Sequence, residues 1–202
     1  MIRSEGCAMA DTTRDLLVTA AADLLDLGGQ TAVTIRAVAD RCGVSHNAPY
    51  KHFAGRQELL AVVAQRDFEQ LRSWFETASL GSAGDARTSL LGALDQLIEY
   101  AHAHPARYRL LFSDQSLTPD DALVGAAFAS FQAFRLLVSR YQREVGQAGL
   151  DDTELAGLIY ATCHGAIDLH LGGRAADAKG LVSVENTIRV LFEALERPAQ
   201  NP

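Results

Sequence analysis

The chain has 202 residues, of which 48% are hydrophobic and 21% charged, and its formal net charge at pH 7 is −7. This composition indicates a folded protein with ample core material and excludes a disordered or fibrous chain. The acidic balance excludes a generally basic nucleic-acid binder, and no run reaches the roughly 18 apolar residues of a membrane span. The first residues lack the apolar stretch of a secretory signal, so we expect a cytoplasmic protein with no membrane partner.

Helical periodicity dominates the first half of the chain. The stretch "TRDLLVTAAADLLDLGG" repeats apolar residues at helical spacing until Gly28 and Gly29 end it. Thr34 is the expected N-cap of a second helix, which Gly43 stops, and Ser45 is the expected N-cap of a third. The helices expected here span about residues 13–27, 34–41, 45–52 and 55–78.

The second half is also helical, and no segment alternates as a strand does. The loop "LGSAGD" at residues 80–85 separates it from the first half. Pro105 and Pro119 are expected to open two of its helices, because proline suits a first helical turn. The helices expected here begin near residues 86, 105, 119, 151 and 183. The fold class predicted is therefore all-α, with about nine helices.

The two short helices at 34–41 and 45–52 are separated only by "CGVS", in which Gly43 can adopt the positive φ of a tight turn. This spacing is typical of a DNA-reading helix-turn-helix, whose second helix enters the major groove. The window 36–56 carries a local positive charge suited to phosphates. Its charged side chains are Arg36, Arg41, Lys51 and Arg56, with Asp40 as the only acid.

The stretch from Thr13 to Val63 resembles the TetR (tetracycline repressor) family of transcriptional regulators. The resemblance rests on Arg14, "AAADLLDLGG" and "VTIRAVADRCGVSHNAPYKHFAGRQELL". It implies an N-terminal three-helix DNA-binding domain at residues 10–58 and a larger helical ligand-binding and dimerisation domain at 59–197. It also implies phosphate contacts by Thr34, Tyr50, Lys51 and Arg56, and positions near base edges for Arg36, His46 and Asn47. We add Ser45 to the predicted DNA-binding residues.

Two stretches of the second half, "HPARYRLLF" and "YATCHGAIDLH", resemble the C-terminal domain of a TetR subgroup named for a Trp-His-Gly signature. His164 and Gly165 match that signature, and Tyr160 stands in place of its tryptophan. The resemblance implies that this domain holds a small-molecule effector, whose binding changes the spacing of the DNA-reading helices.

Aromatic and polar groups are concentrated in the larger domain, where they could line a small-molecule pocket between helices. For each of them alone, core packing is the favoured interpretation. We expect an apolar pocket beside Phe112 and Tyr160 that takes an uncharged or weakly polar ligand. The predicted ligand-binding residues are Trp74, Tyr100, His104, Tyr108, Phe112, Phe128, Phe131, Tyr160 and His164.

Metal binding and catalysis find little support in the sequence. His164 and Asp168 share a helical face, but no third ligand follows at a recognisable spacing. No nucleophile–histidine pattern or phosphate-binding glycine loop is present, so we predict no cofactor and no enzymatic activity. The cysteines Cys7, Cys42 and Cys163 are interpreted as reduced thiols.

We predict a homodimer held by the last two long helices, about 152–171 and 183–195, because operators of helix-turn-helix proteins are read as two half-sites. The alternative is that their apolar stripes only pack inward within one chain. The predicted interface residues are Leu155, Leu158, Ile159, Thr162, Ile188, Leu191, Phe192 and Leu195.

The function predicted is a ligand-responsive DNA-binding transcriptional regulator. In detail, we expect a repressor that binds a palindromic operator in double-stranded DNA as a dimer and is released by a small molecule. The alternative is a helical small-molecule-binding or enzymatic protein that contains an incidental helix corner.

Overall fold

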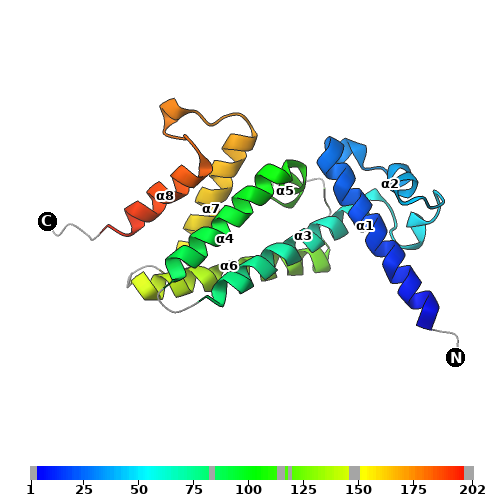
Figure 1. Ribbon diagram of the computed structural model, residues 1–202, viewed down its shortest axis with the longest axis horizontal. Helices are drawn as coiled ribbons and strands as arrows, with labels where there is room; N and C mark the ends of the chain where they lie inside the picture. Colours follow the sequence, from blue (N-terminus) through cyan, green and yellow to red (C-terminus); the bar gives the residue numbers. More distant parts are fainter. Residues whose placement is uncertain (1–3, 82–84, 113–116, 118–119, 146–150, 198–202) are drawn as a thin grey trace. The chain divides into compact units, whose positions relative to one another are not determined.

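The computed structural model describes residues 4–81, 85–112, 117, 120–145 and 151–197. Within these residues the chain forms eight α-helices and two short 3-10 helices, with no strand (Figure 1), which confirms the all-α class. The elements are α1 (Ser4–Ala32), α2 (Ile35–Cys42), η1 (Pro49–Lys51), α3 (Arg56–Ser79), α4 (Ala86–Ala103), α5 (Pro105–Phe112), α6 (Asp121–Val145), α7 (Asp152–Leu171), η2 (Asp177–Lys179) and α8 (Val184–Leu195).

The chain folds into two compact units. Unit 1 contains the residues up to Glu69 together with His104–Phe128, and unit 2 contains Gln70–Ala103 and the residues from Ala129 onward. Helices α3 and α6 therefore each contribute one end to each unit. The functional boundary predicted between residues 58 and 59 stays a prediction. The packing units differ from it because α5 returns to pack against α1.

Unit 1 is built on α1, which packs against both α2 and α5. The regular helix of α1 ends at Gly28 and Gly29, where Gly29 has a φ of +66°, as the sequence predicts. On the side of α5, the Arg107 guanidinium forms a two-pronged ion pair with the buried Asp67 of α3. It also lies 3.5 Å from Asp26 of α1, so one arginine ties three helices together.

Unit 2 is a helical bundle in which α7 packs against α8 and both pack against α4. Figure 1 shows α7 and α8 side by side, joined by the segment that contains η2. Ser183 caps α8 by accepting the Asn186 N–H at 3.0 Å. The bounds of α7 and α8 agree closely with the two helices predicted for the dimer interface.

Helix α6 is the one described helix whose length and apolar composition would also suit a membrane span. Within unit 2, however, its residues Phe134, Leu137 and Val138 are buried in the bundle. Its Arg135 forms an ion pair with Asp152 of α7 at 2.7 Å. These contacts are those of a core helix in a folded bundle.

Candidate DNA-binding surface and ligand pocket

The turn after α2 has the geometry that the glycine predicts. Thr34 caps α2 by accepting the Ala37 N–H at 3.0 Å, which confirms its N-cap position. At the other end Gly43 adopts a φ of +66°, and its N–H donates to the Asp40 carbonyl. Because a side chain is strained at this φ, glycine is the residue that lets the chain turn sharply here.

The helix predicted from Ser45 to His52 is wrong in detail. The chain forms a turn followed by the 3-10 helix η1, and the Ser45 side chain makes no described cap. The reason is Pro49, which has no N–H to donate to the Ser45 carbonyl in an α-helical bond. That carbonyl instead accepts the Ala48 N–H at 2.8 Å, which tightens the segment into a 3-10 turn. Pro49 itself is buried under the turn.

Seven of the eight predicted DNA-binding residues are exposed on the surface of α2, η1 and the residues around them. They are Thr34, Arg36, Ser45, His46, Asn47, Tyr50 and Lys51. Polar side chains are normally exposed, so their exposure around a turn whose floor is Val38, Pro49 and Phe53 shows only that they are accessible to a partner. Their roles toward DNA stay predictions.

Two of these residues converge on the one acid of the segment. His46 Nε2 lies 2.7 Å from Asp40 Oδ1, and Arg36 Nε lies 3.9 Å from Asp40 Oδ2. The neighbouring Arg41 turns the other way and pairs with Asp23 of α1 at 2.8 Å.

Arg56, the eighth predicted residue, is half-buried and has internal partners. Its Nε donates to the Val33 carbonyl at 2.7 Å, and its Nη2 donates to the Gln30 carbonyl at 2.6 Å. These bonds fix the end of α1 to the start of α3, so Arg56 has a structural role besides the phosphate contact that stays a prediction.

The predicted ligand-binding residues fall into both units. In unit 1, the Phe112 ring lies edge-on to the Phe68 ring, with centroids 5.5 Å apart. The centroid of the Phe112 ring is also 5.0 Å from that of the Tyr108 ring. His104 Nδ1 lies 2.8 Å from Asp26 Oδ2, which makes it part of the Arg107 ion-pair cluster. Phe128 is 63% exposed.

In unit 2, the rings of Tyr160 and His164 are in contact one helical turn apart, with centroids separated by 4.1 Å and planes tilted by 53°. The Phe131 ring meets Tyr160 edge-on at 5.5 Å, and Trp74 meets Tyr100 at 5.9 Å. Burial lowers the pKa of His164 to about 4, so its imidazole is neutral at physiological pH. Because Phe112 and Tyr160 belong to different units, a single pocket beside both stays a prediction.

An apolar pocket of about 270 Å³ lies in unit 1, between α3, α5 and the first turns of α6. None of the nine predicted ligand-binding residues lines it, because those residues are mostly aromatic and the pocket walls are mostly aliphatic. The helical spacing of apolar residues 123, 124 and 127 is the signal that could have found it. The lining residues are Ala64, Phe68, Leu110, Leu111, Leu117, Leu123, Val124 and Ala127.

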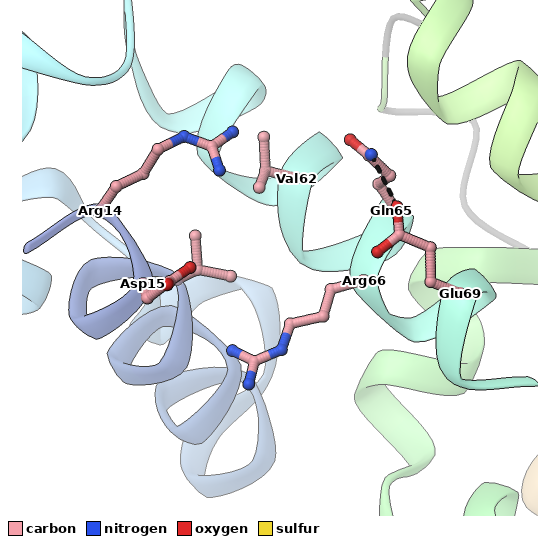
Figure 2. Close-up of a pocket in the computed structure, with 7 residues that line it drawn as sticks. Arg14, Asp15, Val62, Gln65, Arg66 and Glu69 are labelled. Carbon is pink, nitrogen blue, oxygen red and sulfur yellow. Dashed lines mark hydrogen bonds between the residues drawn. The ribbon is translucent and has the colours of Figure 1, made fainter. Parts of the chain in front are cut away.

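A second, polar groove of about 320 Å³ runs between α1 and α3 of the same unit. Figure 2 shows Arg14 reaching into it from α1 and Arg66 from α3, with Asp15 and Glu69 on its rim. Arg14 also lies over the Phe53 ring at 5.5 Å, and Arg66 donates to the Thr19 hydroxyl at 3.0 Å. This groove is charged, whereas the pocket beside α5 is apolar.

The predicted dimer-interface residues divide equally between core and surface. Four of them, Leu155, Ile159, Ile188 and Phe192, are buried within the chain itself, so their side chains contribute to its own core. Leu158 is 45% exposed, and Thr162, Leu191 and Leu195 are half-buried. The accessible face of α7 continues through Ala161 and Gly165, both exposed. The interface itself stays a prediction.

The pair weighed for a metal is occupied by other contacts. Asp168 forms an ion pair with Arg174 at 2.6 Å, and the His164 ring contacts the Tyr160 ring. Among the described residues, no group of three histidine, cysteine or carboxylate side chains is placed to hold a metal ion. Of the described cysteines, Cys42 and Cys163 are free thiols, and burial raises the pKa of Cys163 to about 12.

An exposed polar helix-turn-helix, an apolar pocket in the same unit and a second helical unit together define a DNA-binding regulator with a ligand site. Comparison with known families agrees. Residues 17–63 match the family described as "Bacterial regulatory proteins, tetR family", and residues 90–195 match "Tetracyclin repressor-like, C-terminal domain". The chain belongs to the TetR family. Proteins of this family are DNA-binding transcriptional regulators and not enzymes.

Two curated relatives are similar in sequence. The HTH-type transcriptional activator FasR of Mycolicibacterium smegmatis is 32% identical over 108 residues, which is 54% of this chain and 49% of FasR. The nucleoid occlusion factor SlmA of Glaesserella parasuis is 27% identical over 143 residues, which is 68% of this chain and 69% of SlmA. The matched part of the chain thus spans only about half the length of FasR.

Two solved structures share the fold. A protein of unknown function from Rhodococcus sp. RHA1 superposes with a TM-score of 0.76 at 26% identity, covering 91% of this chain and 93% of the other. SmeT, the repressor of the Stenotrophomonas maltophilia efflux pump SmeDEF, gives a TM-score of 0.64 at 17% identity, covering 90% and 87%. Family membership implies DNA binding, dimerisation and a small-molecule effector. Assignment to the Trp-His-Gly subgroup stays a prediction.

Proposed function

We propose that the chain acts in the cytoplasm as a homodimeric repressor, which binds a palindromic operator and leaves it when a small apolar molecule binds. The observation that carries this proposal is the apolar pocket of about 270 Å³ inside the unit that bears the helix-turn-helix. Helix α3 contributes Ala64 and Phe68 to the pocket wall, and its first residue, Arg56, holds the end of α1. A ligand that moves α3 therefore acts directly on the DNA-reading segment.

Helix α5 supplies a second connection between the pocket and α1. Leu110 and Leu111 line the pocket, and Arg107, one turn earlier, binds Asp67 of α3 and approaches Asp26 of α1. Breaking an ion pair that has a buried partner leaves an uncompensated buried charge, so the pair opposes displacement of either helix. A ligand that displaces α5 would strain this pair and so change the position of α1, which is the coupling between sites that allostery requires.

The lining of the pocket indicates the class of effector. All of its described lining side chains are hydrocarbon, and none of these carries a charge or a hydrogen-bonding group. A carboxylate or ammonium group would lose its hydration there without gaining a partner. The effector is therefore an uncharged, mostly apolar molecule, and a small one, because the volume lies at the lower end of the range for ligand pockets.

The accessible parts of α7 and α8 support the homodimer. Leu158, Ala161 and Gly165 form an exposed stripe of apolar and small residues on α7, and Val190 of α8 is 49% exposed. Two copies pairing these helices would form a four-helix interface that buries the same patch on each subunit. Light scattering tests this: we expect twice the 21.7 kDa mass of one chain, and a mass of one chain at micromolar concentration would contradict it.

Ligand binding is tested with pairs of probes that differ only in charge. Medium-chain fatty alcohols should raise the melting temperature of the full-length protein by a few degrees at saturation, and fatty acids of equal length should not. Leu111→Trp, which fills the pocket, should abolish the shift. Leu80→Trp is the matched control, because Leu80 is 86% exposed and does not line the pocket. Equal shifts for alcohols and acids would contradict the apolar site.

The direction of regulation is tested with a reporter gene under the protein's own promoter. A repressor that is released by its ligand gives low expression without the ligand and high expression after ligand addition or after deletion of the repressor gene. Leu111→Trp, which no longer binds the ligand, should keep expression low with or without it. The relative FasR is named as an activator. Loss of expression on deletion would therefore replace the repressor proposal with activation while leaving DNA binding intact.

A further inference from the structure

Asp40 is an unfavourable residue for a surface that approaches DNA. It is the only acid in residues 36–56, beside four basic side chains. Its carboxylate is exposed at the end of α2, next to the predicted DNA-reading residues. A negative charge there repels phosphates. Its contact with His46 contributes little to folding, since both side chains are more than half exposed, at 57% and 54%. The acid therefore calls for a functional explanation.

The contact with Asp40 determines which nitrogen of His46 carries the proton. An ionised carboxylate can only accept hydrogen bonds, so the 2.7 Å contact requires a hydrogen on Nε2 of the imidazole. In the neutral ring this leaves Nδ1 without a hydrogen, as an acceptor. Without Asp40, both tautomers of an exposed histidine are available, and Nδ1 can be either a donor or an acceptor.

The arrangement also limits the electrostatic cost of the acid. Arg36, one helical turn earlier, lies 3.9 Å from the second carboxylate oxygen and balances its charge. Arg41 pairs with Asp23 and does not compete for Asp40. Asp40 therefore lies between the Arg36 guanidinium on its own helix and the His46 imidazole after the turn.

We propose that Asp40 is a specificity-determining residue, which makes His46 Nδ1 a hydrogen-bond acceptor and so selects a base that presents a donor. In the major groove, only adenine and cytosine present an exocyclic amino group, whereas guanine and thymine present acceptors at the corresponding edge. The wild-type protein therefore prefers adenine or cytosine where His46 reads and rejects guanine. This inference rests on the proposed DNA-binding function and adds the identity of the base class.

The test uses a pool of DNA duplexes with a randomised core of about 20 base pairs, which accommodates two half-sites one turn apart. The full-length wild type, His46→Ala and Asp40→Asn each select from this pool, and the bound duplexes are sequenced. His46→Ala identifies the position that His46 reads, because base preference disappears there. The side-chain amide introduced by Asp40→Asn can donate to Nε2 and so make Nδ1 a donor, which suits guanine.

We expect Asp40→Asn to raise guanine relative to adenine and cytosine by about tenfold at the His46 position and to leave the other positions unchanged. Glu76→Gln is the matched control. It removes the acid of another exposed ion pair, Arg72–Glu76 at 2.7 Å, outside the DNA-reading segment, and should reproduce the wild-type preferences.

Three results would overturn the inference while leaving DNA binding established. They are an unchanged preference at the His46 position in Asp40→Asn, an equal change at every position, and a His46→Ala variant that loses no preference. Tighter binding to all sequences without a change in preference would assign Asp40 a purely electrostatic role. If the wild type itself enriches no sequence, the proposed function fails and this inference fails with it.

Discussion

Two regions, α2 with η1 and α7 with α8, were expected to contact another molecule, and their predicted contact residues differ in solvent exposure. Around α2 and η1, seven of the eight predicted residues are exposed, whereas on α7 and α8 four of the eight are buried within the chain. The difference follows from the residue types. A polar side chain is costly to bury, so its spacing predicts an outward face. An apolar stripe at helical spacing faces either a partner or the chain's own core, and the spacing alone does not distinguish them.

The largest effect expected is that of Phe192→Asp. The ring is fully buried, 5.2 Å from the Tyr141 ring, and the nearby Arg87 already pairs with Glu196. A carboxylate there is desolvated without a partner, so we expect a loss of more than about 4 kcal/mol in the free energy of unfolding. Urea denaturation followed by circular dichroism measures it. A folded monomer instead would mean that Phe192 faces a partner subunit.

Leu158→Asp, unlike Phe192→Asp, should affect dimerisation more than folding. Leu158 is 45% exposed on α7, so the change should alter stability of the isolated chain by less than about 1 kcal/mol. It should nevertheless separate the dimer and weaken operator binding by about 100-fold, because two linked half-sites bind more tightly than one. Light scattering and a DNA titration provide the two readouts. A dimer that persists with unchanged DNA affinity would move the interface away from this face.

How far the sequence predicted each region depends on how local its determinants are. The all-helical class, the break at Gly29 and the turn at Gly43 follow from local chemistry, and all were predicted correctly. The replacement of a regular helix by η1 follows from the missing N–H of Pro49, which is also local, but the helix prediction for 45–52 did not include its effect. The apolar pocket depends on residues from three helices far apart in sequence, which periodicity does not bring together.

Within the DNA-reading segment, two substitutions should separate base readout from phosphate contact. Asn47→Ala should cost about 1–3 kcal/mol on the preferred sequence and little on others, because it removes a base contact. Lys51→Ala should weaken binding to all sequences alike and reduce the slope of log affinity against log salt by about 1. Titrations at three salt concentrations measure both. If both variants behaved alike, the assignment of separate roles would fail.

The smallest effect expected is a pH dependence confined to unit 2. Burial lowers the pKa of His164 to about 4, against about 6.5 for an unfolded histidine. Between these values the unfolded chain binds the proton and the folded chain does not, so stability is fully present above pH 6.5 and falls as the pH decreases toward 4. We expect a loss of about 2 kcal/mol over this range, less than the full shift implies because the side chain is only half-buried.

His164→Gln cannot titrate, so its loss of stability between pH 6.5 and 4 should be smaller than that of the wild type by this amount. His102→Gln, which removes an exposed histidine from α4, should retain the wild-type dependence. Identical pH profiles for the wild type and His164→Gln would show that the imidazole remains accessible to protons in the folded chain. Its ring contact with Tyr160 would then belong to an open site rather than to the core.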